Sequence, residues 1–192
     1  SFIKIVLLTA LCTINPHLFS NETSQLSQND VRKVSLTNVK LDSFSQEGNL
    51  ELELEATSLR QDTSSGESHL TNLRLKLETS SGTLWSIESQ TGTVSTRGST
   101  QDEITDQQIE LSGNVLISRR TTEDLLIEIR GDNFILFPKR QYGESLSSVT
   151  VNSGNNVTTA GKLSIDLRLG EMKLGSSSTQ YVETKISELK DW

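Results

Sequence analysis

The sequence predicts an all-β fold, and two patterns support this prediction. Apolar and polar residues alternate with period two, as in residues 48–57, GNLELELEAT, where one face is apolar and the other acidic. Turn residues also recur about every 8 to 15 positions, a spacing typical of a sandwich, jellyroll or barrel. After Pro16 no segment shows a clear 3.6-residue helical period, and a helix is possible only in residues 183–192.

Residues 1–19 are the most apolar stretch of the chain. The run from Phe2 to Ile14 is shorter than the roughly 20 apolar residues that cross a bilayer. It is therefore either a short membrane anchor or the apolar part of a signal peptide. We expect a retained transmembrane helix, because no cleavage site of the small-x-small type follows Ala10. A buried core helix is the alternative. The polar residues 20–30 then form a linker, and residues 31–192 form one β domain.

The strands of this domain are expected in a regular series. Alternating segments occur at residues 34–44, 49–56, 70–79, 84–96, 145–154 and 162–186. Residues 108–120 and 124–140 are each predicted to form two short strands, joined at Ser112-Gly113-Asn114 and at Gly131-Asp132-Asn133. A strand, glycine turn and strand recur loosely in ELSGNVLIS and DLRLGEMKLGSS. Because such a unit cannot bury its own apolar face, it stacks on similar units. The result is a twisted, open jellyroll of stacked antiparallel strands.

Composition argues against several classes of function. A net charge of −7 and a pI near 4.9 argue against a nucleic-acid partner. The single Cys12 permits neither an intrachain disulfide nor a thiolate metal cluster. The histidines His17 and His69 lack the spacing of a triad or a metal site, and the acidic residues 99–108 lack that of an EF-hand. We therefore expect no metal, no cofactor and no enzymatic activity.

Two basic pairs leave two interpretations open. Arg119-Arg120 and Lys139-Arg140 each follow an apolar alternating run. They are interpreted first as charged strand ends in turns. The alternative is that they contact phosphates or lipid head groups.

The second half of the chain carries an ordered series of features. LWSIES is followed by IELSGNVLISRR, IEIRGDNFILFP, SGNNVTTAGKLSIDLRLGEMKL and TQYVE. In this order and spacing, residues 84–185 resemble the LptC family, the bitopic inner-membrane component of the bacterial lipopolysaccharide exporter. Between residues 42 and 82 only the strand pattern agrees with the family. An N-terminal anchor, a polar linker and an all-β body also agree with it.

The resemblance implies a function and partners. LptC-like proteins fold as a periplasmic β-jellyroll, receive lipopolysaccharide from the transporter subunits LptF and LptG, and pass it to the bridge protein LptA. The ATPase LptB drives this movement, and residues 1–192 contain no nucleotide-binding P-loop of their own. The expected location is the inner membrane, with a single span and the β domain in the periplasm of a Gram-negative bacterium.

The resemblance and the alternation together predict two sets of site residues. The acyl chains of lipopolysaccharide would contact aliphatic and aromatic residues of the apolar faces, while Glu51, Glu53 and Glu55 would face water. These lipid-contacting residues are Leu50, Leu52, Leu54, Leu73, Leu75, Leu77, Trp85, Ile87, Ile117, Leu163, Ile165 and Leu167. Partner proteins would contact the first and last strands and the glycines before the last strands, namely Val34, Leu36, Gly154, Gly161, Tyr181 and Val182.

Three other interpretations stay open at this stage. A soluble LptA-like bridge protein has the same strand pattern and differs by lacking a retained N-terminal helix. A cell-surface carbohydrate-binding β-sandwich would need exposed aromatic residues, of which this chain has few, such as Trp85, Tyr142 and Trp192. An enzyme on a jellyroll scaffold would need an acid–base constellation, which the sequence does not indicate.

Overall fold

The computed structural model describes residues 33–45, 47–62, 65–80, 82–97, 106–120, 126–178 and 181–185. The predicted membrane anchor, residues 1–19, and the predicted linker, residues 20–30, lie outside this part of the chain. Most of the possible C-terminal helix, residues 186–192, lies outside it as well. Within the described ranges, no helix is long and apolar enough to span a bilayer.

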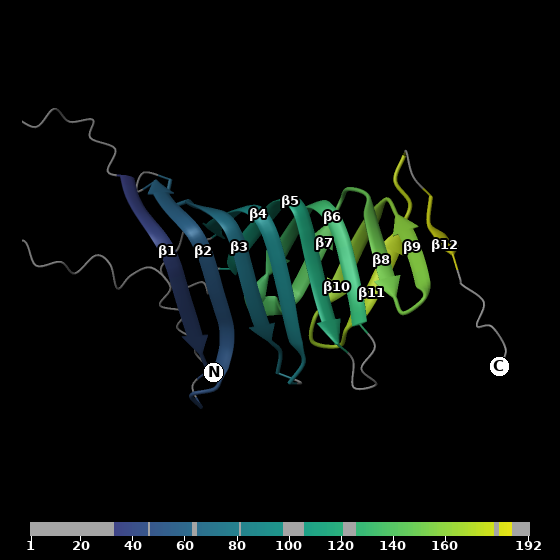
Figure 1. Cartoon of the computed structure of the whole chain (residues 1–192), viewed down its shortest axis with the longest axis horizontal. Coiled ribbons are helices and arrows are strands. Elements are labelled where there is room, and N and C mark those ends of the chain that lie inside the picture. Colours follow the sequence, from purple (N-terminus) through teal and green to yellow (C-terminus); the bar gives the residue numbers. More distant parts are fainter. Residues whose placement is uncertain are drawn as a thin grey trace, which may run out of the picture.

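Twelve antiparallel strands form one sheet, which confirms the predicted all-β class (Figure 1). Six long strands come first and shorter ones follow. The only helical element among the described residues is a single 3-10 turn, η1. The elements are β1 Lys33–Phe44, β2 Leu50–Asp62, β3 Ser68–Glu78, β4 Leu84–Arg97, β5 Asp106–Arg120, β6 Leu126–Phe137, η1 Pro138–Arg140, β7 Tyr142–Ser145, β8 Val149–Ser153, β9 Asn156–Ala160, β10 Lys162–Asp166, β11 Glu171–Gly175 and β12 Glu183–Lys185.

The strand order follows the chain and then divides at β6. Strands β1 to β6 pair consecutively, as in a meander. The C-terminal half of β6 continues into β7, β10 and β11, whereas its N-terminal half continues into β8, β9 and β12. In Figure 1, β1 therefore lies at one end of the long axis, and β9 and β12 lie at the other.

The long strands bend near their middles. Asn38, Asn72 and Asn114 have φ values of 52°, 49° and 49°, in β1, β3 and β5 respectively. Asparagine tolerates this left-handed backbone conformation better than most residues. The pairing register also shifts between β4 and β5, and between β5 and β6, at the same level along the strands. Such bulges bend a strand and increase its twist.

The bend divides the molecule into two arms that face each other. We call the first arm residues 39–44, 50–56, 73–78, 84–89, 115–120 and 126–131, with β8, β9 and β12. The second arm consists of residues 33–37, 58–62, 68–71, 91–97, 106–112 and 133–137, with β7, β10 and β11. Side chains from the inner faces of both arms make one apolar cluster between them.

This arrangement corrects the prediction for two segments. Residues 108–120 and 124–140 were each expected to form two strands separated by a turn. Instead β5 and β6 are each continuous through the glycine-containing positions, and Ser112 and Val115 lie on either side of the register shift. The local residues are those of a turn, but pairing with the neighbouring strands on both sides makes them a bend.

Candidate functional site

The apolar interior between the two arms is the candidate site. Of the twelve residues predicted to contact lipid, eleven are buried there. The exception is Leu50, which lies at the end of β2 and is 37% exposed. The eleven buried residues are Leu52, Leu54, Leu73, Leu75, Leu77, Trp85, Ile87, Ile117, Leu163, Ile165 and Leu167.

Further residues complete this interior and were missing from the predicted set. They come from the half of β5 in the second arm, from both halves of β6, and from β8 and β9. Their alternation within the expected strands would have identified most of them, because each occupies every second position of its run. They include Ile109, Leu111, Ile129, Phe134, Leu136, Val149, Val151 and Ala160.

The interior is closely packed around its centre. Trp85, Ile87, Ile117 and Ile165 have no solvent-exposed surface. The apolar face of β2 therefore packs against the protein's own side chains in this structure. An acyl chain that entered the centre would have to separate the two arms, because a close-packed interior has no room for added methylene groups.

Burial decreases toward the β1 end of the interior. Leu36, Val39 and Leu41 of β1 are only half-buried, although they pack against the apolar cluster. Phe44, the last residue of β1, is 56% exposed. Since β1 pairs only with β2 among the described strands, its other edge presents free backbone groups. The apolar interior therefore reaches the surface beside an unpaired strand edge.

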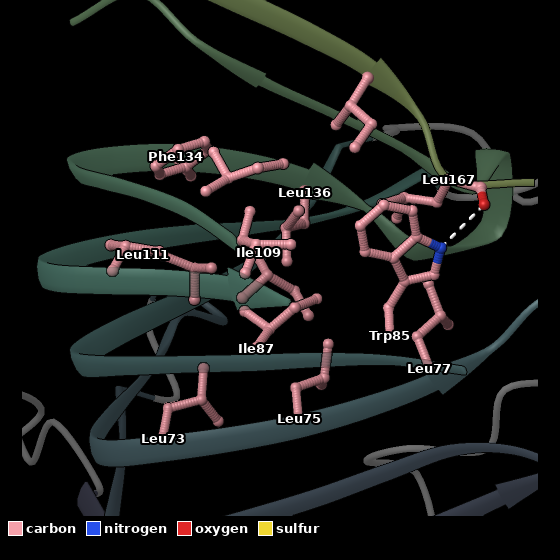
Figure 2. Packing of buried hydrophobic residues seen from close by; sticks show 14 of the residues in the cluster. Leu73, Leu75, Leu77, Trp85, Ile87, Ile109, Leu111, Phe134, Leu136 and Leu167 are labelled. Carbon is pink, nitrogen blue, oxygen red and sulfur yellow. Dashed lines mark hydrogen bonds between the residues drawn. The ribbon is translucent and has the colours of Figure 1, made fainter. Parts of the chain in front are cut away.

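Opposite the bend, the free margins of the two arms meet along a line that we call the seam. At least three hydrogen bonds between described residues cross it. Trp85 Nε1 donates to the Leu167 carbonyl oxygen at 2.8 Å, as Figure 2 shows. Ser80 Oγ donates to Gln141 Oε1 at 3.4 Å, and Arg119 Nη2 donates to the Gly170 carbonyl oxygen at 3.5 Å. The turn between β10 and β11 thus closes the interior from the second arm.

The outer face of the first arm is charged, as the alternation predicts. Lys76 Nζ contacts Glu53 Oε1 at 2.8 Å, and Lys40 Nζ lies 3.5 Å from both Glu53 Oε2 and Glu55 Oε1. The hydrogen bond from Lys76 holds the pKa of the Glu53 carboxyl below its usual value, and the charge of Lys40 adds to this effect. Polar and apolar faces are therefore cleanly separated on β2.

The outer side of the bend carries a polar groove of about 680 Å³. Amide, hydroxyl and charged side chains line most of it, including those of Asn38, Asn72, Gln90, Asn114 and Arg74. Three of its lining residues, Val39, Ala56 and Leu73, also belong to the apolar cluster or pack against it.

The predicted partner-contacting residues lie at the two ends of the molecule. Val34 and Leu36 are half-buried in β1. At the other end, Tyr181 is 83% exposed, and Val182 next to it is also exposed. They directly precede β12, which pairs with β9.

Gly154 and Gly161, the two glycines at this end, each occupy a position that suits glycine, but for different reasons. Gly154 has φ +58° in the β8–β9 turn, a conformation that suits glycine. Gly161 is buried, and a Cβ there would overlap Ser177, which follows β11. Its backbone N–H also donates to the Gly175 carbonyl oxygen at 3.0 Å.

Comparison with known protein families shows which family the chain belongs to. Residues 2–183 match the family described as lipopolysaccharide-assembly, LptC-related. The chain belongs to this LptC-related family. The match extends over the N-terminal apolar segment and the linker as well as the β domain, so it covers more of the chain than the sequence resemblance of residues 84–185. No sequence among curated proteins matches the chain significantly.

A solved structure has the same fold as this LptC-related chain. It is the crystal structure of LptH, the LptA-homologous periplasmic component of the conserved lipopolysaccharide transport device of Pseudomonas aeruginosa. The TM-score is 0.54 at 12% sequence identity, and the match covers 71% of this chain and 95% of LptH. At this identity the likeness concerns the fold alone.

Family membership assigns the LptC-related chain to lipopolysaccharide transport on the periplasmic side of the export system. Proteins of this family are transport components and not enzymes.

Proposed function

We propose that this protein carries lipopolysaccharide on its way from the inner to the outer membrane, with the acyl chains between the two arms. The observation that supports this proposal best is the continuous apolar inner face, which contains buried residues from β2 through β10. Each Å² of apolar surface removed from water contributes about 25 cal/mol, and acyl chains between the arms would gain this contribution in place of the side-chain contacts that they displace. No specific hydrogen bond to the tails is needed.

The transfer proceeds, in this proposal, from one end of the jellyroll to the other. The β1 edge receives lipopolysaccharide from LptF and LptG. The ATPase LptB drives this movement of lipopolysaccharide. The C-terminal end, with Tyr181 and Val182 exposed before β12, docks on LptA. Strand addition at an open edge satisfies backbone groups that would otherwise promote aggregation. The protein itself is a passive conduit.

We further propose that residues 1–19 anchor the protein in the inner membrane as a single helix, with residues 20–30 as the linker to the β domain. The apolar run from Phe2 to Ile14 supports this assignment. Intact-mass analysis of protein extracted from membranes tests it, because removal of the segment would leave a shorter, soluble chain resembling LptA-type bridges.

Site-specific photo-crosslinking in cells tests the interior path. Photoreactive residues at Leu52, Leu75, Ile117 and Ile165 face the interior and are expected to capture lipopolysaccharide. Photoreactive residues at Glu53 and Glu55, on the charged outer face of the first arm, serve as controls and are expected to capture little. Equal capture at both sets of positions would reject the interior as the lipid path.

A further inference from the structure

Arg119 occupies an unusual position on the inner face of the first arm. Val115 and Ile117 of β5 are buried toward the interior, and Arg119 is the next residue with the same orientation. A charged residue thus takes the inward position nearest the seam. The family match and the apolar interior do not explain a cation at this place.

The guanidinium of Arg119 is held in place by weak partners. Its Cζ lies 4.8 Å from the ring centroid of Trp85, an arrangement typical of a cation–π contact. Nη2 reaches the Gly170 carbonyl oxygen at 3.5 Å, which is long for a hydrogen bond. Nε is buried without any hydrogen-bond partner. A Cβ on Gly170 would overlap the guanidinium in its present position, and the φ of +70° at Gly170 favours glycine.

Three other arginines of the described domain have acidic partners. Arg74 pairs with Glu88, Arg130 with Glu128 and Arg168 with Asp166. Among the described residues, no carboxylate lies within ion-pair distance of Arg119. Its charge is therefore left without a counter-ion within the described domain, although the planar group is already oriented by the indole beneath it.

We propose that Arg119 is an anion-recognition residue at the seam and binds a phosphate on the acylated sugar of lipopolysaccharide. This inference rests on the proposed function. A lipid with its tails between the arms must leave its phosphate at a margin, because an apolar interior cannot solvate that charge. Arginine binds phosphate through two or more charge-assisted hydrogen bonds, which are stronger than a bond to a neutral carbonyl group.

The same exchange of partners would weaken the seam. When phosphate replaces the Gly170 carbonyl group as the acceptor, the turn between β10 and β11 loses one of its contacts to the first arm. The Trp85–Leu167 hydrogen bond then remains beside it. Binding of the head group at the seam is in this way coupled to entry of the tails.

Binding of defined lipids to the full-length protein in detergent tests the proposal. The probes are lipid A that carries its phosphates, the same lipid A after chemical removal of the phosphates, and inorganic phosphate alone. Arg119→Gln is expected to weaken binding of the phosphorylated lipid about tenfold, the factor for one charge-assisted hydrogen bond, and to leave binding of the dephosphorylated lipid unchanged. Arg119→Lys should recover part of the loss.

Arg130→Gln is the matched control, because Arg130 lies on the adjacent strand β6 but is exposed and paired with Glu128. It should bind both lipids like the wild type. Equal weakening of both lipids by Arg119→Gln, or no weakening of either, would overturn the phosphate assignment. Millimolar inorganic phosphate should compete weakly with the phosphorylated lipid for the wild type and not for Arg119→Gln, and equal competition in both proteins would overturn Arg119 as the phosphate ligand. If the wild type binds neither lipid, the proposed function itself fails.

Discussion

The indole Nε1 of Trp85 donates a 2.8 Å hydrogen bond to the carbonyl oxygen of Leu167, which lies 82 positions later in the chain. This bond connects the margin of the first arm with the turn that closes the second arm. The ring is fully buried and also supports the guanidinium of Arg119. The Trp85 side chain thus contacts the apolar interior, the seam and the inward-facing Arg119.

We expect Trp85→Phe to destabilise the protein. The variant leaves the buried Leu167 carbonyl group without its donor and removes part of a fully packed ring. The free energy of unfolding should fall by about 2 kcal/mol in urea titration. Leu84→Ala is the control. Leu84 is the exposed neighbour of Trp85, so this substitution should change the free energy of unfolding by less than about 0.5 kcal/mol. Equal stability of Trp85→Phe and the wild type would show that the bond contributes nothing.

Closing the seam covalently should prevent lipid uptake. Ser80 and Gln141 face each other across it at 3.4 Å, so cysteines at both positions can be joined by a short, reducible bis-thiol linker in a Cys12→Ser background. Because the packed interior must open to admit tails, the linked protein should bind no lipopolysaccharide, and reduction should restore binding. Each single-cysteine variant treated with the same reagent is the control. Undiminished binding by the linked form would mean that tails enter without separation of the arms.

The turn at the seam should weaken in acid. The Leu169 backbone N–H donates to Asp166 Oδ1 at 3.0 Å, and this bond, together with the charge of Arg168, lowers the pKa of the Asp166 carboxyl. A depressed folded-state pKa stabilises the fold fully above the unfolded value of about 3.9, and that contribution disappears as pH falls through the folded value.

Asp166→Asn should therefore lower the urea midpoint at neutral pH and flatten its decline below about pH 4. Glu171→Gln removes a charge from the same turn without removing this hydrogen bond, and it should keep the wild-type profile. Identical acid profiles for wild type and Asp166→Asn would contradict this role of the carboxylate.

Gly161→Val should disturb the C-terminal end. The new side chain would overlap Ser177, and such overpacking costs about 1–3 kcal/mol. Displacement of the chain after β11 should also weaken capture of LptA in a pull-down. Ser178→Val, an exposed neighbour of the contact, is the control and should bind normally. Wild-type stability and capture by Gly161→Val would show that the close approach is unimportant.

Much of the apolar interior could be predicted from alternation alone, whereas the bend could not. Leu52 and Leu54 were assigned to it because a period of two leaves one face apolar. At the bend the inward positions are three residues apart, as from Ala56 to Leu59 in β2 and from Leu70 to Leu73 in β3. That change of phase is a usable signal, although only pairing with both neighbouring strands distinguishes a bend from a turn.

The contact of Arg119 at the seam could not be predicted from the sequence, because its partner is distant in the chain. Arg119 was interpreted first as a charged strand end, and its position on the strand agrees with that. What the sequence lacks is the partner: Gly170 lies 51 positions away, and no local pattern connects the two. Leu50 shows the opposite error, because it has the correct phase for the interior but lies at the exposed end of β2.

Fluorescence of Trp85 tests the central claim most directly. The chain has two tryptophans, so Trp192→Phe leaves Trp85 as the only one, fully buried between the arms. Lipid A with bromine-labelled acyl chains quenches an indole only on contact. Binding should quench Trp85 strongly with labelled tails and leave it unquenched with unlabelled tails. Tight binding of the labelled lipid without quenching would place the tails outside the interior and contradict the account.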